Sequence, residues 1–270
     1  MRVDEHTIQL DGTPVFFRDA ESSRVPPLYL HGLPTSSDDW LGLLERTGGI
    51  APDLIGFGRS SKAGNLDYTL EGHADFIERL LGELGVGRVQ LVAHDWGAGG
   101  GLVFAQRHPE RIERIVLIDA LPLLDGFSWN RVGRIWRRPG IGELVMGSVT
   151  RGMLNRAIRR ACVTDDAWPD ARLRAVWDQF DQGTQRAILR LYRAADPDQL
   201  ASAGSGLAEL DAPAFVLWGE RDPWFAPEFA DAYAARLSHA TARRIDGAGH
   251  WPWLEHAGAA DEVVAFLDGG

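Results

Sequence analysis

The pattern of hydrophobic positions alternates between strands and helices. Short apolar runs bounded by Gly, Pro or charged residues predict buried strands, and these runs fall in residues 26–32, 87–95, 111–120 and 212–222. From Tyr68 to Leu84 the apolar positions are three and four residues apart, which predicts an amphipathic helix with one face on a sheet. Residues 7–10 and 14–20, joined by "DG", predict a hairpin. This alternation favours a parallel α/β sheet with crossover helices.

The pattern changes after Ala120. Residues 121–206 hold helical runs, such as 142–161 and 171–180, and no good strand. The segment "SAGSG" (202–206) is typical of a linker, after which the strand pattern resumes. We therefore predict one α/β core, formed by residues 1–120 and 207–270, with a helical lid of residues 121–206 inserted into it.

Composition agrees with a globular protein. The 270 residues are 45% hydrophobic and 24% charged, with a single cysteine. The N-terminus lacks the apolar segment of a secretion signal, and no apolar run reaches the roughly 18 residues of a membrane span. We therefore expect a cytoplasmic protein without a membrane segment. A net charge of −10 argues against nucleic acid as a partner.

The charge is unevenly distributed. The predicted lid has 13 Arg against 9 Asp or Glu, although the chain as a whole is acidic. Residues 131–160 alone hold eight Arg and one acidic residue, Glu143. This excess favours a solvated helical face. An anion-attracting lid and a loose membrane contact are alternatives that the sequence does not separate.

The stretch "LVAHDWGAGGG" (91–101) places a carboxylate where a predicted strand passes into a predicted helix. Small residues stand two positions to either side of Asp95, at Ala93 and Gly97, as a sharp strand–turn–helix motif requires. The N-terminus of the helix also favours an anion. This context indicates a nucleophile at Asp95, and the structural alternative is a helix cap, a frequent role of Asp.

Two distant residues also follow predicted strands. Asp222 comes just past the strand in 212–222, and His250 lies in the glycine-rich loop that ends the strand and loop of 241–250. Open α/β sheets keep their sites at the C-terminal ends of the strands. We therefore expect Asp95, Asp222 and His250 to converge as nucleophile, acid and base. Asp119, at the end of residues 111–120, is an alternative acid.

These features resemble the α/β-hydrolase superfamily, and within it the branch with an aspartate nucleophile, the epoxide hydrolases and haloalkane dehalogenases. The resemblance covers nearly the whole chain apart from the lid. It implies a mostly parallel, twisted sheet flanked by helices, with an inserted helical lid. The segments that carry it are "LHGLPTSSDDW" (30–40), "APDLIGFGRSSK" (51–62), "AHDWG" (93–97), "WGERDPW" (218–224) and "GAGHWPW" (247–253).

A carboxylate nucleophile suits attack at a saturated carbon, because the product is an alkyl ester that water can cleave. Asp95 would form this ester, and His250 would then deprotonate the water that cleaves it. Asp222 would orient His250 and stabilise its charged form. The resemblance implies that the backbone N–H groups of Leu33 and Trp96 form the oxyanion hole.

The leaving group divides the two families. Epoxide hydrolases donate to the ring oxygen, usually from two lid tyrosines, and Tyr192 resembles the second of these, while Trp136 or another residue would stand near the first. Dehalogenases hold the halide between two N–H donors. Trp96 could be one donor, but Leu33 stands where most dehalogenases have Asn. We therefore expect an epoxide hydrolase, with a haloalkane dehalogenase as the alternative.

The expected substrate is a small hydrophobic epoxide or halogenated compound, with water as the only co-reactant. His31 and Pro34, in the "HGLP" turn, are expected beside the substrate. No pair of His or Cys has the spacing of a metal site, so we expect neither a metal nor a cofactor. A cofactor-free, luciferase-like oxygenase and a non-catalytic ligand receptor are further alternatives, although a receptor would not need a catalytic triad.

Overall fold

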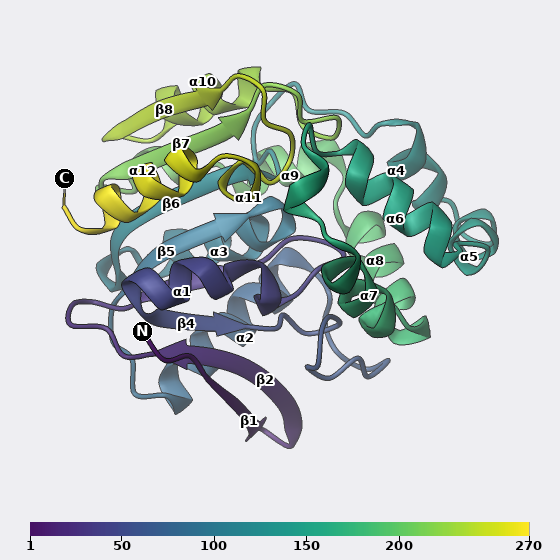
Figure 1. Ribbon diagram of the computed structural model, residues 1–270, viewed down its shortest axis with the longest axis horizontal. Helices are drawn as coiled ribbons and strands as arrows, with labels where there is room; N and C mark the ends of the chain where they lie inside the picture. Colours follow the sequence, from purple (N-terminus) through teal and green to yellow (C-terminus); the bar gives the residue numbers. More distant parts are fainter. Residues whose placement is uncertain (270) are drawn as a thin grey trace.

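The computed structural model describes residues 1–269, which form a twisted eight-stranded sheet covered by helices on both faces (Figure 1). The strand order is β1-β2-β4-β3-β5-β6-β7-β8, in which β1 and β2 are antiparallel to their neighbours and the remaining pairs are parallel. The strands are β1 (Asp4–Leu10), β2 (Thr13–Ala20), β3 (Pro27–Leu30), β4 (Gly49–Pro52), β5 (Val89–His94), β6 (Ile112–Ala120), β7 (Ala214–Gly219) and β8 (Ala240–Ile245). The prediction of an α/β fold with a mostly parallel sheet is confirmed.

Helices cover the sheet because each has one apolar face. In α2 the buried side chains include Leu70, Ala74, Ile77 and Leu81, the positions that the spacing predicted. The helix begins at Leu70 because the side chain of Thr69 accepts a hydrogen bond from the backbone N–H of Gly72. The helices that flank the sheet are α1 (Leu41–Thr47), α2 (Leu70–Glu83), α3 (Asp95–Arg107), α10 (Glu228–Arg236), α11 (Pro252–Glu255) and α12 (Ala257–Leu267).

Between β6 and β7 the chain leaves the sheet and forms helices that gather beyond one edge of it (Figure 1). They are α4 (Arg131–Trp136), α5 (Ile141–Gly147), α6 (Arg151–Arg160), α7 (Asp170–Gln179), α8 (Gln182–Ala194) and α9 (Pro197–Ala203). The predicted run 142–161 is two helices rather than one, because the side chain of Thr150 caps a new helix at Arg151. The predicted linker 202–206 begins inside α9, which ends only at Ala203.

No helix among the described residues combines the length and the apolar character needed to cross a membrane. The hydrophobic core lies on both faces of the sheet and continues beneath the helices that follow β6. The C-terminal ends of β5, β6 and β7 all face these helices, so residues just past these strands meet at one edge (Figure 1).

Candidate active site

Asp95 is held at a sharp turn between β5 and α3. Its backbone has φ of 49°, the left-handed region that side chains other than Gly rarely adopt. The turn also brings α3 against the end of β3, so a Cβ at Gly97 would lie 2.5 Å from the carbonyl oxygens of Leu30 and His31. Only glycine fits there. A strained backbone at the tip of a turn is a common feature of functional sites.

The carboxylate of Asp95 does not cap its helix. Its Oδ2 accepts a hydrogen bond of 2.8 Å from the backbone N–H of Leu33 in the loop after β3, and α3 has no side-chain cap. Burial raises the pKa of Asp95 to about 6, although the nearby His250 and the backbone N–H groups of Leu33 and Trp96 act to lower it. The same two N–H groups therefore stabilise negative charge on this carboxyl group.

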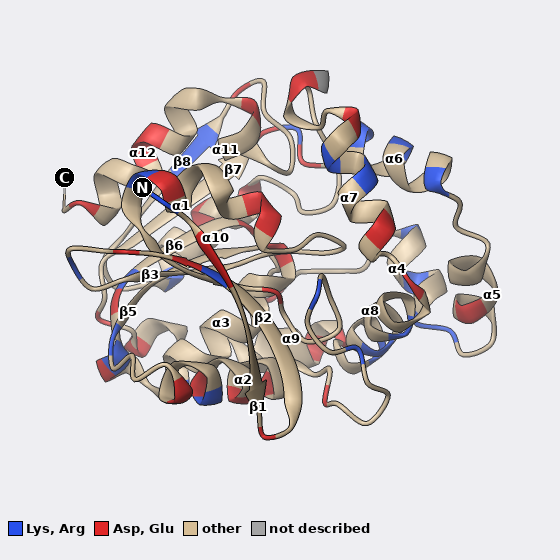
Figure 2. Cartoon of the chain, turned by 60° about the horizontal axis from the view of Figure 1, so that its bottom comes forward, with Lys and Arg blue, Asp and Glu red and all other residues tan. Residues whose placement is uncertain are grey.

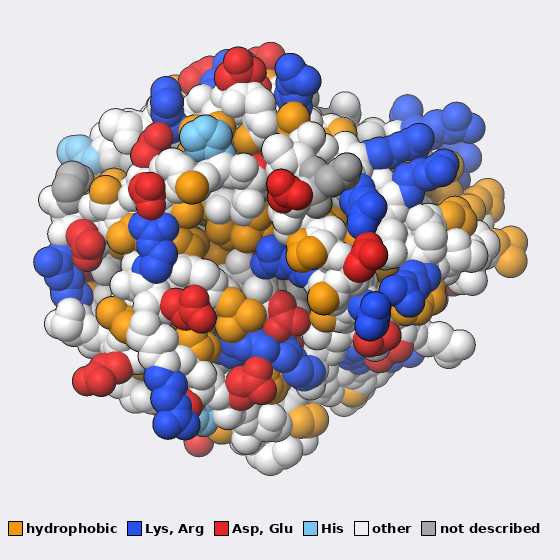
Figure 3. Space-filling model, viewed as in Figure 1, with side chains coloured by type: hydrophobic (Ala, Val, Ile, Leu, Met, Phe, Trp, Pro, Cys, Tyr) orange, Lys and Arg blue, Asp and Glu red, His pale blue; other side chains and the backbone are white. Residues whose placement is uncertain are grey.

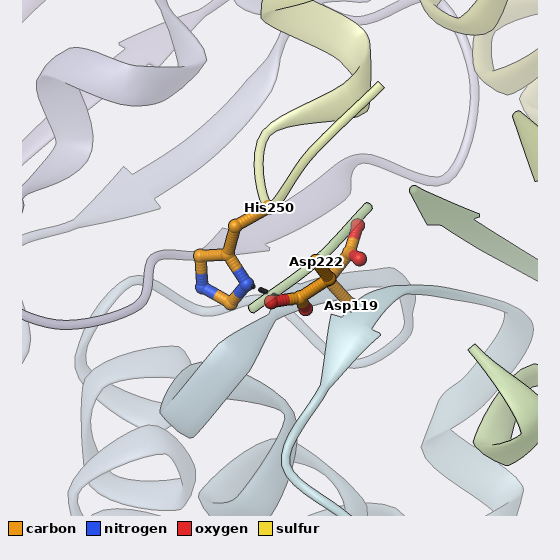
Figure 4. Close-up of side chains that lie close together, drawn as sticks. All are labelled: Asp119, Asp222 and His250. Carbon is orange, nitrogen blue, oxygen red and sulfur yellow. Dashed lines mark hydrogen bonds and ion pairs between the residues drawn. The ribbon is translucent and has the colours of Figure 1, made fainter. Parts of the chain in front are cut away.

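His250 and Asp222 face each other past the ends of β8 and β7 (Figure 4). Nδ1 of His250 lies 2.8 Å from Oδ2 of Asp222, and both side chains are fully buried. The other oxygen of Asp222 accepts a hydrogen bond of 2.8 Å from the backbone N–H of Trp224. Nε2 of His250 is buried and has no hydrogen-bond partner among the described residues. This nitrogen is thus available to a water molecule or a substrate.

Asp119 ends β6 beside this pair, but it is not bonded to the imidazole (Figure 4). Its Oδ1 accepts a hydrogen bond of 3.1 Å from the backbone N–H of Gly219. Burial, followed by the charge of the neighbouring Asp222, raises the pKa of Asp119 well above its usual value. Asp119, Asp222 and His250 each offer one atom of a type that can ligate a metal ion, and these three atoms lie within 4.8 Å of one another. The geometry therefore favours Asp222 over Asp119 as the partner of His250.

A largely apolar cavity of about 340 Å³ lies over Asp95. It is bounded by the two loops after β3 and β7 and by the helices that follow β6. The lining residues are Leu33, Pro34, Asp95, Phe127, Trp129, Asn130, Val132, Gly133, Trp136, Val145, Met146, Val149, Met153, Leu154, Ala157, Ile158, Phe180, Ile188, Tyr192, Trp224 and Phe225. Such a cavity suits a small hydrophobic ligand.

Tyr192 of α8 stands in the cavity wall next to Trp96, with 5.0 Å between the ring centroids. The pKa of Tyr192 is raised, mainly by burial and then by the charge of Asp95, while the Trp96 side chain acts to lower it. Tyr192 and Asp95 both line the cavity, so the Tyr192 O–H is a donor that a ligand can meet there.

Two tryptophans from the segment between β6 and β7 also pack against Tyr192. The Trp136 ring lies perpendicular to the Tyr192 ring at 5.0 Å, and its N–H is buried without a partner among the described residues. Trp129 stacks on Trp96 at 5.6 Å, but its N–H donates to the carbonyl oxygen of Ala195. Of these two indoles, only Trp136 has an N–H that is free to meet a ligand.

His31 and Pro34, the first and last residues of the "HGLP" turn, lie in different places. Pro34 lines the cavity. His31 is fully buried and is not among the lining residues, because its Nδ1 is 2.8 Å from the carbonyl oxygen of Gly32 and its Nε2 accepts from the backbone N–H of Leu54. Both ring nitrogens are thus used within the protein, and His31 joins two loops.

Sequence reasoning missed two neighbours of His250. His94 precedes the turn, lies 4.4 Å from the His250 ring and bonds through Nε2 to the carbonyl oxygen of His250. Burial keeps the pKa of His94 well below its usual value, so this ring is neutral. Trp224 packs at 4.3 Å against the other side of His250. Both residues lie within motifs that carry the family resemblance, "AHDWG" (93–97) and "WGERDPW" (218–224).

Known proteins resemble the chain over nearly its full length. A haloalkane dehalogenase from Bradyrhizobium diazoefficiens is 27% identical over 94% of this chain and 90% of its own. A cis-3-alkyl-4-alkyloxetan-2-one decarboxylase from Xanthomonas campestris is 31% identical over 88% of this chain and 87% of its own. Both matches therefore extend over most of this chain and of the relative.

Solved structures also resemble the chain over nearly its full length. A haloalkane dehalogenase from Bradyrhizobium elkani superimposes with a TM-score of 0.85 at 24% identity, covering 99% of this chain and 98% of its own. An epoxide hydrolase superimposes with a TM-score of 0.84 at 20% identity, covering 99% of both chains. The family described as alpha/beta hydrolase fold matches residues 28–257. The chain therefore belongs to the α/β-hydrolase fold family.

Proposed function

We propose that the chain hydrolyses a bond at a saturated carbon through an ester on Asp95, with an epoxide as its substrate. The observation that carries this proposal is the hydrogen bond from Leu33 N–H to Oδ2 of Asp95. With Oδ2 held there, Oδ1 can attack a carbon atom in the cavity, displace the ring oxygen and form an alkyl ester. Oδ2 then becomes the carbonyl oxygen of that ester.

The ester is cleaved by water in the second step. Nε2 of His250, which has no partner within the described part of the chain, takes a proton from a water molecule as the water attacks the carbonyl carbon. Asp222 stabilises the imidazolium, and the N–H groups of Leu33 and Trp96 stabilise the oxyanion. The oxygen of the water stays on Asp95, Oδ1 leaves with the product, and the imidazolium protonates the product.

The leaving group is an oxygen atom on this proposal. Because Tyr192 lines the cavity together with Asp95, its O–H can donate to the ring oxygen as negative charge develops there. Tyr192 recovers its proton from the Asp95 carboxyl group at the end of the cycle, so that one water molecule and one epoxide give one diol.

A haloalkane is the second candidate, and Trp136 is the observation that favours it. Its buried N–H is unpaired among the residues described and lies on a cavity-lining side chain, so it could bind a departing halide. The relative from Bradyrhizobium diazoefficiens is a haloalkane dehalogenase. The 31%-identical relative is named as a decarboxylase of an oxetan-2-one, which is likewise a strained ring that contains an oxygen atom.

We also propose that residues 121–206 act as the lid, because most residues that line the cavity belong to this segment. The test is one assay with three substrates: styrene oxide scored for diol, 1-bromobutane scored for bromide, and a cis-3,4-dialkyloxetan-2-one scored for carbon dioxide. The Asp95→Asn variant serves as the blank. The proposal predicts diol as the main product. Bromide release without diol formation would overturn it in favour of the second candidate.

A further inference from the structure

The helices α4 to α6 carry a group of unpaired arginines. Residues 131–160 hold eight arginines, of which Arg137 pairs with Asp196 and Arg159 with Asp170. The single acidic residue of this stretch, Glu143, pairs with Arg193. The remaining arginines are exposed and make no ion pair with any described residue: Arg131, Arg134, Arg138, Arg151, Arg156 and Arg160. Figure 2 shows this basic character on the lid helices.

The same helices expose large apolar side chains. Leu144 is 76% exposed, and four others are between 38% and 55% exposed: Val132, Ile141, Val145 and Met153. Figure 3 shows hydrophobic side chains gathered at the edge of the molecule over α5, close to a group of basic side chains. We call these five apolar residues and the six unpaired arginines the lid patch.

The lid patch is continuous with the cavity above Asp95. Val132, Val145 and Met153 line the cavity and are also exposed at the surface. The cavity therefore reaches the surface within the patch. A compound that enters there passes from the apolar side chains of the patch to the apolar wall of the cavity without crossing a polar surface.

We propose that the lid patch docks on an anionic lipid bilayer. The apolar side chains would enter the boundary between headgroups and acyl chains, and the arginines would bind lipid phosphates. The mouth of the cavity then faces the lipid, in which hydrophobic compounds concentrate. This inference goes beyond the proposed chemistry and does not depend on the identity of the leaving group.

Charge favours a bilayer over a second copy of the chain. A two-fold dimer through the lid patch would place the same unpaired arginines against one another, because such an interface is built from one patch on both subunits. The chain outside residues 121–206 is strongly acidic, so it is repelled by an anionic surface. Screening over about 8 Å at physiological salt limits the repulsion to residues close to the bilayer, which orients the lid patch toward it.

The test is flotation of the full-length protein with vesicles of phosphatidylcholine alone and of phosphatidylcholine mixed with phosphatidylglycerol. The protein is expected to float with the mixed vesicles and to be released by high salt. Leu144→Ser and the double variant Arg134→Gln/Arg156→Gln should each lower the bound fraction, the latter by about tenfold or more. Matched controls outside the lid are Leu41→Ser, also an exposed apolar position, and Arg221→Gln/Arg236→Gln, which replaces two exposed arginines that make no ion pair with any described residue.

Any of these results would overturn the proposal: no flotation of the wild type with mixed vesicles, an equal loss in the control variants, or a dimer in solution that Leu144→Ser dissociates while vesicles bind nothing. Binding to polyglutamate but not to vesicles would also overturn it, in favour of an acidic protein. Hydrolysis of a dissolved substrate should be the same in Leu144→Ser and in the wild type. Failure of the docking proposal and failure of the proposed function are therefore separate results.

Discussion

Nδ1 of His250 lies 2.8 Å from Oδ2 of Asp222, while Asp119 beside them bonds instead to the backbone of Gly219. The two acids thus have different environments although both follow strands of the same sheet edge. Burial and then the charge of Asp222 raise the pKa of Asp119, since two adjacent carboxylates cannot both ionise cheaply. Because their environments differ, replacing the two acids should have unequal effects on hydrolysis.

Asp222→Asn should slow hydrolysis of the ester by about 10²–10⁴-fold, because the imidazolium loses the charge that stabilises it. Asp119→Asn should slow it by less than about tenfold, since the amide oxygen can still accept from Gly219 and His250 is untouched. Rapid-quench measurement of the ester separates this step from its formation. A larger loss in Asp119→Asn would identify Asp119 as the acid of the triad.

Asp95→Asn should abolish turnover and stabilise the fold. The folded protein binds a proton at Asp95 more tightly than the unfolded chain does, so the carboxylate destabilises the native state above about pH 6 and not below its ordinary pKa of 3.8. The raised pKa corresponds to about 2 to 3 kcal/mol at neutral pH. Urea unfolding at about pH 7.5 and pH 4 should show a gain that shrinks in acid. A loss of about 1 kcal/mol would instead indicate a helix cap.

The rate of ester formation should fall as the pH drops through about 6, because the attack requires ionised Asp95. The measurement is kcat/KM against pH with a neutral substrate. Burial also raises the pKa of Asp39 to about 6, so Asp39→Asn is the matched control. The acid limb should persist in that variant. Its disappearance there would assign the limb to Asp39.

Tyr192→Phe should lower kcat/KM for an epoxide by about 10–100-fold and leave the release of bromide from a haloalkane almost unchanged. Only the ring oxygen needs a proton in the first step. Tyr68→Phe removes a hydroxyl that bonds to the carbonyl oxygen of Ala63 and is the control. A greater loss with the haloalkane would reverse the order of the two proposed substrates.

The sheet and the convergence of Asp95, Asp222 and His250 could be predicted because strand ends in a parallel sheet share an edge. The break between α5 and α6 could not, since the apolar spacing continues across Thr150, whose side chain caps the start of a new helix at Arg151. The place of His31 depends on the backbone N–H of Leu54, a contact between distant loops. The contact between the Trp96 and Tyr192 rings likewise depends on how α8 packs over the turn.

The most direct test of the ester on Asp95 is a single turnover in water labelled with oxygen-18, with enzyme in excess over substrate. Mass spectrometry then locates the label in the product and in the peptide that contains Asp95. The mechanism predicts that the label enters the Asp95 carboxyl group and that the product of this first turnover contains none, because water attacks the carbonyl carbon of the ester. Label in the product and none in the protein would contradict the mechanism.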